Sequence, residues 1–192
     1  NLSDFKKGAS KLHAPGLNMM YGDAKDNIAW FASGKLYRYR DSLYTKTYLD
    51  GPSGADEILE YLDFDQNPQA VNPSWNYVYS ANNQPNAVGS ELYPGYYLNE
   101  SRAKRIVDLV APKDDWTKEE VAEMMNDVTA PVASPIIVNF IKSLDKTALS
   151  SSEKIAISNL RNWKGNFDKN ETGPVIYNRI VYEFQKNTFS DE

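Results

Sequence analysis

Residues 18–32 read NMMYGDAKDNIAWFA, and this stretch decides the fold. Apolar runs at 18–21 and 28–32 flank the polar segment 22–27. An apolar run, a polar turn and a second apolar run are typical of an antiparallel β-hairpin. We therefore expect a hairpin close to the start of the chain.

Further extended structure is predicted after this hairpin. Residues 36–40 alternate in polarity, as the residues of a half-buried strand do. Residues 41–73 are rich in Gly, Pro, Asp and Asn, which predicts a long loop with one turn of helix at 56–61. The aromatic run at 75–80 predicts another strand, and Pro85 ends its pairing because proline has no backbone donor.

Helical periodicity dominates the second half. Apolar residues recur at helical spacing in segments that begin near residues 102, 118, 134, 151 and 174. Capping boxes at 117–120 and 150–153 mark two of these starts, and Asn99 is the expected N-cap of the first segment. Pro174 suits the first position of the last helix. A short additional helix, N-capped by Ser3, is expected at the start of the chain.

These elements give a strand-rich part, residues 1–98, followed by a helix-rich part, residues 99–192. Strands gathered in one part and helices in the other predict an α+β fold. We expect both parts to form a single fragment, 1–192, of a larger domain. No apolar run approaches the roughly 18 residues that a membrane span needs, and no export signal opens the chain.

Composition excludes several kinds of function. The 192 residues carry 21 basic and 26 acidic side chains, so there is no cation-rich face for nucleic acid. The absence of cysteine excludes disulfides, thiolate metal sites and a cysteine nucleophile. His13 is the only imidazole, which excludes zinc sites built on several histidines. Its place before Pro15 and Gly16 predicts the end of a helix entering a turn rather than a catalytic residue.

Four motifs follow one another along the chain in the order of a known family. They are the runs 18–30, 62–68 with 72–73, 77–85 with 101–102, and 162–165. The third, which begins YVYSANNQP, is the most specific; in the fourth, Lys164 stands where the family has an acid. Together they resemble the penicillin acylase (penicillin amidase) family over nearly the whole chain. The match is weaker in the helices after Val110.

The resemblance implies a fold and a reaction. Members of this family are N-terminal-nucleophile hydrolases with an αββα sandwich, matured by autoproteolysis, that hydrolyse the amide bond between an acyl group and an amine. The nucleophile is the first residue of the larger mature chain, usually serine, with its own α-amino group as base. The carboxamide of Asn1 is no nucleophile. We therefore expect an internal piece of the larger chain, whose partners are the small chain and the nucleophile-bearing segment of the same precursor.

The resemblance also assigns roles to individual residues. Asn82 matches the family's oxyanion-hole asparagine, which acts together with a backbone N–H from an upstream segment. Arg102 matches the arginine that orients this asparagine, and Leu17 matches a position in the acyl pocket. Glu91 falls where the family has an aspartate ligand of a structural calcium ion, although the other ligands lie mostly outside this chain. No cofactor is expected for catalysis.

Two plainer interpretations remain open for the matched residues. Asn82, which precedes Asn83 and Pro85, also suits a turn that ends a strand. Arg102 also suits a simple helix cap. A different class of function is open as well: a non-catalytic binding or scaffold module with an acylase-like sheet and a tyrosine-rich loop that holds a ligand or partner. The tyrosines of this loop are Tyr93, Tyr96 and Tyr97.

The resemblance leaves the substrate unspecified. β-Lactam side chains, acyl-homoserine lactones and other small N-acylated amines all suit the family. The matched family implies a periplasmic or extracellular location. It implies no nucleic acid partner.

Overall fold

The computed structural model describes residues 1–40, 43, 46–85, 95–145 and 147–190. Its contacts divide the chain into two compact units, Asn1–Asp114 and Asp115–Glu192. The described strands all lie in the first unit, and the second unit is helical. The protein is therefore α+β, as predicted.

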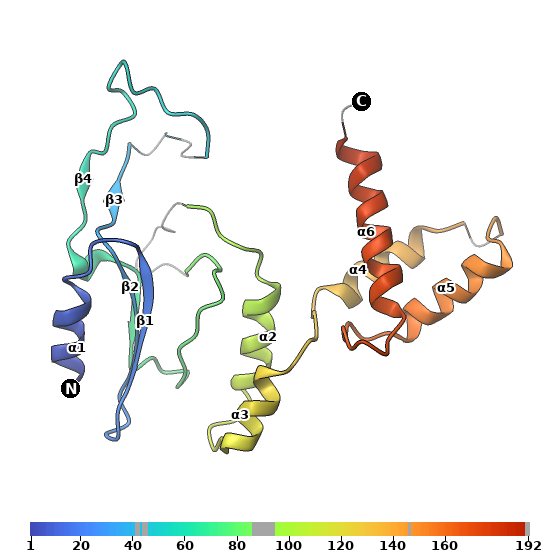
Figure 1. Cartoon of the computed structure of the whole chain (residues 1–192), viewed down its shortest axis with the longest axis horizontal. Helices are drawn as coiled ribbons and strands as arrows, with labels where there is room; N and C mark the ends of the chain where they lie inside the picture. Colours follow the sequence, from blue (N-terminus) through green and yellow to red (C-terminus); the bar gives the residue numbers. More distant parts are fainter. Residues whose placement is uncertain (41–42, 44–45, 86–94, 146, 191–192) are drawn as a thin grey trace. The chain divides into compact units, whose positions relative to one another are not determined.

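The predicted hairpin lies at the centre of the first unit (Figure 1). Strand β1 (Leu17–Gly22) pairs antiparallel with β2 (Ile28–Ser33), which places Leu17 opposite Ser33 and Gly22 opposite Ile28. A third strand, β5 (Gln69–Val71), pairs antiparallel with the other edge of β2. The hairpin is confirmed, whereas β5 was not predicted because three residues are too few to show an alternating pattern.

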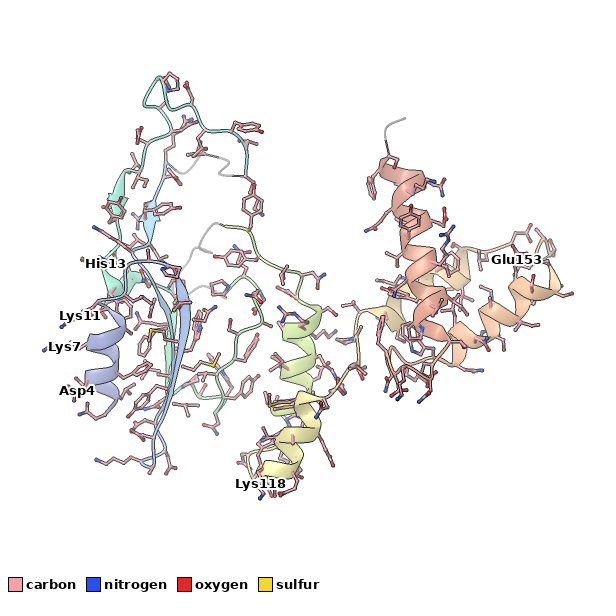
Figure 2. The ribbon with its side chains drawn as sticks, in the orientation of Figure 1. Asp4, Lys7, Lys11, His13, Lys118 and Glu153 are labelled. Carbon is pink, nitrogen blue, oxygen red and sulfur yellow. The ribbon has the colours of Figure 1, made fainter. Side chains whose placement is uncertain are left out.

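Helix α1 (Leu2–Ala9) covers one face of this sheet (Figure 1). The Phe5 ring lies 5.1 Å from the Tyr21 ring and 6.2 Å from the Phe31 ring, measured between centroids. Phe31 is 1% exposed, so it is the centre of this small core. The polar side of α1 is turned away from the sheet, as Figure 2 shows for Asp4 and Lys7. This is the amphipathic division expected of a surface helix.

The cap of α1 differs from the prediction. Asn1, not Ser3, is the N-cap: its Oδ1 accepts a hydrogen bond of 3.0 Å from the backbone N–H of Asp4. Asparagine caps a helix as well as serine does, so the sequence offered two equivalent starts. The prediction of Ser3 was wrong by two residues.

The region after the hairpin also differs from the prediction. Of residues 36–40, only β3 (Tyr37–Arg38) is a strand, and it pairs antiparallel with β4 (Glu60–Tyr61). The predicted turn of helix at 56–61 is therefore wrong. Cross-strand contacts explain the pairing: an Arg38–Glu60 ion pair of 3.1 Å, and an edge-to-face contact of 6.5 Å between the rings of Tyr37 and Tyr61. The 3₁₀ turn η1 (Phe64–Gln66) then leads to β5.

The predicted strand at 75–80 is not paired with any strand among the described residues. Alternating polarity shows that a segment suits an extended backbone, but a strand also needs a neighbouring edge to bond with. Here the segment lines a cavity instead. Its place in the site is described below.

The second unit contains the helices predicted for it. These are α3 (Lys118–Met125), α4 (Ala133–Ser143), α5 (Ser151–Asn162) and α6 (Gly173–Phe189). Both capping boxes are confirmed: Thr117 N donates to Glu120 Oε2 at 2.9 Å, and Ser150 N donates to Glu153 Oε2 at 2.8 Å. Figure 2 shows Lys118 and Glu153 in the first turns of α3 and α5. None of the described helices is both long enough and apolar enough to span a membrane.

Trp163 is the largest side chain in the core of the second unit, and it is 5% exposed. Its ring lies 5.1 Å from the ring of Phe167 and 5.4 Å from that of Tyr177 on α6. Its Nε1 donates to the backbone oxygen of Asn166. The fourth matched motif, 162–165, therefore contributes Trp163 to the core of the second unit, whereas Asn162 and Lys164 are exposed.

The β1–β2 turn is closed by one carboxylate. Asp23 Oδ1 accepts hydrogen bonds from the backbone N–H groups of Lys25 at 2.9 Å and Asn27 at 3.1 Å, and Oδ2 accepts one from the Tyr21 hydroxyl at 2.8 Å. Partial burial raises the pKa of Asp23, but the hydrogen bonds from Tyr21, Asn27 and Lys25 outweigh it and hold the pKa at about 2, against an ordinary value of 3.8. The ionised form of Asp23 therefore stabilises the hairpin.

We expect Asp23→Asn to lower the free energy of unfolding at pH 7 and to have less effect near pH 2. The folded-state pKa is depressed, so the stabilisation is fully present above pH 3.8 and is lost as the pH falls through about 2. Urea unfolding of both proteins at several pH values measures the difference. Asp26→Asn removes the same charge from the same turn and controls for charge at pH 7. An effect of Asp23→Asn that does not depend on pH would contradict this role.

Candidate oxyanion site at Asn82

A tight turn at Ala81, Asn82 and Asn83 follows the unpaired segment 75–80. Asn82 has a φ of 58°, the left-handed region in which asparagine is one of the few tolerated residues. The Asn82 carbonyl accepts a 2.8 Å hydrogen bond from the backbone N–H of Leu98. The turn is therefore held to the segment that leads into α2 (Ser101–Val110).

Arg102, in the first helical turn of α2, is hydrogen-bonded to the turn at Ala81–Asn83. Its Nη2 donates to Asn82 Oδ1 at 2.8 Å and to the Ala81 carbonyl at 2.7 Å. The N-cap of α2 is Glu100 rather than the predicted Asn99, whose Oδ1 instead accepts from the backbone N–H of Ser101 at 3.2 Å. Arg102 lies in the helix and reaches back to the turn, so the plain helix-cap interpretation does not describe its contacts.

The contact with Arg102 decides which way the Asn82 amide points. A guanidinium group only donates hydrogen bonds, so the atom that it contacts must be the amide oxygen. The Nδ2 group of Asn82 is left as a donor, and within the described part of the chain it has no acceptor. Asn82 is exposed. The arrangement presents a fixed, uncharged N–H donor at the surface of the first unit.

A small cavity adjoins the turn. It has a volume of about 150 Å³. Trp30 of β2 lines it on the side of the sheet, and Trp75, Tyr77 and Tyr79 of the unpaired segment line it as well. Asn83 lines it as well. Burial raises the pKa of the Tyr79 hydroxyl above its usual 10, and the neighbouring Tyr77 and Glu100 add to the shift. Tyr79 is therefore a neutral contact group at neutral pH.

No contact links Leu17, the candidate residue of the acyl pocket, to Asn82 or Arg102 among the described residues. Leu17 begins β1 opposite Ser33, is 51% exposed and does not line the cavity. Strand alternation places it on the same side of β1 as Met19, whereas Trp30 is opposite Met20. Its acyl-pocket role stays a prediction.

The proposed calcium ligand Glu91 lies outside the described residues, and so does Tyr93. Among the residues that the structure does describe, no group of three acidic or histidine side chains is gathered that could hold a metal ion. His13 is exposed (Figure 2), and its carbonyl accepts from Lys35 N at 2.9 Å. Helix α1 ends at Ala9, earlier than predicted, and His13 lies in the irregular chain that follows it.

Tyr96 belongs to the tyrosine-rich loop and is 78% exposed. Its hydroxyl donates to the Lys46 carbonyl at 2.9 Å, and the Lys46 ammonium lies 5.7 Å from the centre of its ring. Both contacts join the loop to its own unit. They offer no distinct support for a ligand at this tyrosine.

Comparison with solved structures gives the class of fold. The chain is similar to a thermostable penicillin G acylase from Alcaligenes faecalis, with a TM-score of 0.68, 23% sequence identity and coverage of 88% of this chain. The match covers 31% of that acylase chain, so the protein described here spans less than a third of it. This likeness establishes a shared fold.

The family follows from the sequence as a whole. The model of the penicillin amidase family matches residues 1–192, and the chain belongs to that family. The resemblance seen in the four motifs is thereby confirmed.

Sequence reasoning missed one residue of the turn. Asn83 Oδ1 accepts from the backbone N–H of Ala81 at 3.2 Å, and its Nδ2 donates to the Gln84 carbonyl at 3.2 Å. The Asn-Asn doublet was visible in the sequence, but a sequence does not tell which asparagine faces outward and which binds the backbone.

Proposed function

We propose that the protein is part of an amidohydrolase that cleaves the amide bond between an acyl group and an amine. Its membership of the penicillin amidase family and its fold similarity to a penicillin G acylase support this reaction class. On this proposal, the chain contributes to an αββα sandwich whose nucleophile is the N-terminal residue of the mature large chain. That nucleophile comes from a segment of the precursor outside these residues.

The orientation of the Asn82 amide is the observation that carries the proposal. When the nucleophile adds to the acyl carbon, negative charge develops on the former carbonyl oxygen. A neutral N–H donor that is already aimed stabilises this charge without reorganisation. Arg102 occupies Asn82 Oδ1 at 2.8 Å and so leaves Nδ2 to serve as that donor. Arg102 acts through Asn82 rather than on the substrate.

The remaining parts of the proposal rest on the resemblance. Leu17 contributes to the acyl pocket, and Glu91 is a ligand of a structural calcium ion in the complete protein. The substrate is a small N-acylated amine. The protein works in the periplasm or outside the cell.

N-terminal sequencing and intact mass of the protein purified from its source test the proposal first. We expect a large chain that begins upstream of Asn1 at Ser, Thr or Cys, with a separate small chain bound to it. A native protein that begins at Asn1 with no second chain would contradict the amidohydrolase. It would favour the binding module instead.

A panel of N-acylated amines tests the reaction itself. The complete protein is expected to release free amine from at least one member of a set containing N-acyl amino acids, acyl-homoserine lactones and β-lactam amides. Mutation of the N-terminal nucleophile to alanine should abolish the release. Turnover that survives this mutation would contradict an N-terminal-nucleophile mechanism.

A further inference from the structure

We propose that Asn83 is a positioning residue that holds Asn82 in its donating conformation, an inference that rests on the proposed function. Asn83 follows Asn82 in the chain, and its side chain turns back along the backbone. Its Oδ1 accepts from the backbone N–H of Ala81, the residue before Asn82, at 3.2 Å. The hydrogen bond therefore closes a ring of atoms that contains the backbone of Asn82.

This ring constrains the backbone at Asn82, the residue of the turn with an unfavourable φ. Asn82 has a φ of 58°, which an L-residue adopts at some cost in free energy. A second bond, from Asn83 Nδ2 to the Gln84 carbonyl at 3.2 Å, fixes the Asn83 side chain itself. Both amide atoms of Asn83 are thus used within the turn. Without them, Asn82 can relax toward the ordinary φ regions and carry its amide away.

Asn83 and Arg102 hold the turn from two different directions. Arg102 binds the Ala81 carbonyl and Asn82 Oδ1, whereas Asn83 binds the Ala81 N–H. Asn83 also lines the aromatic cavity of about 150 Å³ beside Tyr79, and it is only half exposed. The hydrogen bonds to Ala81 N and the Gln84 carbonyl therefore explain why a polar side chain, Asn83, lines a mostly aromatic cavity.

Steady-state kinetics of the complete processed enzyme test this role. We expect Asn83→Ala to lower kcat about tenfold and to leave KM within about twofold, because a misplaced donor weakens transition-state binding rather than substrate binding. Asn83→Asp keeps an oxygen that accepts from Ala81 N but lacks the N–H that binds the Gln84 carbonyl, so it should recover part of kcat. A kcat for Asn83→Asp no better than that of Asn83→Ala would overturn the role of the Ala81 bond.

A double mutant separates positioning from general stability. Asn83→Ala should cause no further loss of kcat when it is added to Asn82→Ala, since the group that it positions is already gone. Losses that multiply would overturn the inference. If Asn83→Ala does not fold, Asn83→Gln answers the same question, because it keeps the amide but displaces the oxygen by one methylene.

Asn72 supplies the matched control in the same unit. It has a φ of 44°, its Oδ1 accepts from Ile28 N at 2.9 Å, and its Nδ2 donates to Asn27 Oδ1 at 3.1 Å. Asn72→Ala removes two comparable hydrogen bonds and should lower Tm without changing kcat. An equal fall of kcat in this control would overturn the inference. Wild-type kcat in Asn82→Ala would instead overturn the proposed function.

Discussion

Asn82→Ala in the complete enzyme is expected to lower kcat about 10²–10³-fold, the usual result of losing one oxyanion donor, which corresponds to about 2.7–4 kcal/mol. The amide is held by Arg102 through Oδ1 at 2.8 Å, so the substitution removes an aimed Nδ2 donor and nothing else that reaches outward. Substrate binding in the ground state should change little. Steady-state kinetics on an N-acylated substrate measure both constants.

Asn76→Ala is the matched control for backbone strain. Asn76 has a φ of 61° against 58° for Asn82, and both side chains are exposed. The backbone strain that alanine adds should therefore be similar at the two positions, at about 1 kcal/mol. Only Asn82→Ala should lose turnover. Equal losses of kcat in both variants would contradict the oxyanion assignment and point to a folding effect.

Gly173→Ala is expected to destabilise the second unit by about 3 kcal/mol or more, at the upper end of the cost of overpacking a core. A Cβ atom at Gly173 would lie 2.7 Å from Trp163 Cδ2 and 2.8 Å from Trp163 Cβ, and closer still to Cγ. Trp163 is 5% exposed and packs against Phe167 and Tyr177, so it cannot move aside without disrupting the core. Urea unfolding followed by near-ultraviolet circular dichroism measures the loss.

Gly8→Ala is the control: the same substitution is expected to stabilise the protein here. Gly8 lies inside α1, and nothing is within 4 Å of a Cβ placed there. Alanine should therefore stabilise the helix by about 0.5–1 kcal/mol through lower backbone entropy. A Gly173→Ala protein that unfolds at the wild-type urea concentration would contradict the packing against Trp163.

Local signals in the sequence predicted the elements whose stability is local. The hairpin at 18–32 and the capping boxes at 117–120 and 150–153 were predicted because each depends on residues close together in the chain. Pro174 likewise lies in the first turn of α6. The N-cap of α1 was wrong only because Asn1 and Ser3 are equivalent caps.

Pairings between distant segments were not predictable in this way. β3 pairs with β4 across about twenty residues of loop, so the predicted helical turn at 56–61 was wrong. β5 joins β2 from a segment that showed only loop composition, and 75–80 remains unpaired despite its strand-like pattern. A sequence pattern reports the backbone that a segment tolerates, whereas its partner depends on the whole fold.

The sequence by itself determined the α+β class, the family and the candidate pair Asn82 and Arg102, because these follow from local periodicity and from residue identity. Only the tertiary structure decided how Arg102 and Asn82 interact. Arg102 donates to the amide oxygen of Asn82 from a helix twenty residues away, and Asn83 closes the turn around Asn82. The direction of a hydrogen-bond donor depends on where three separate groups meet in space, and folding alone brings them together.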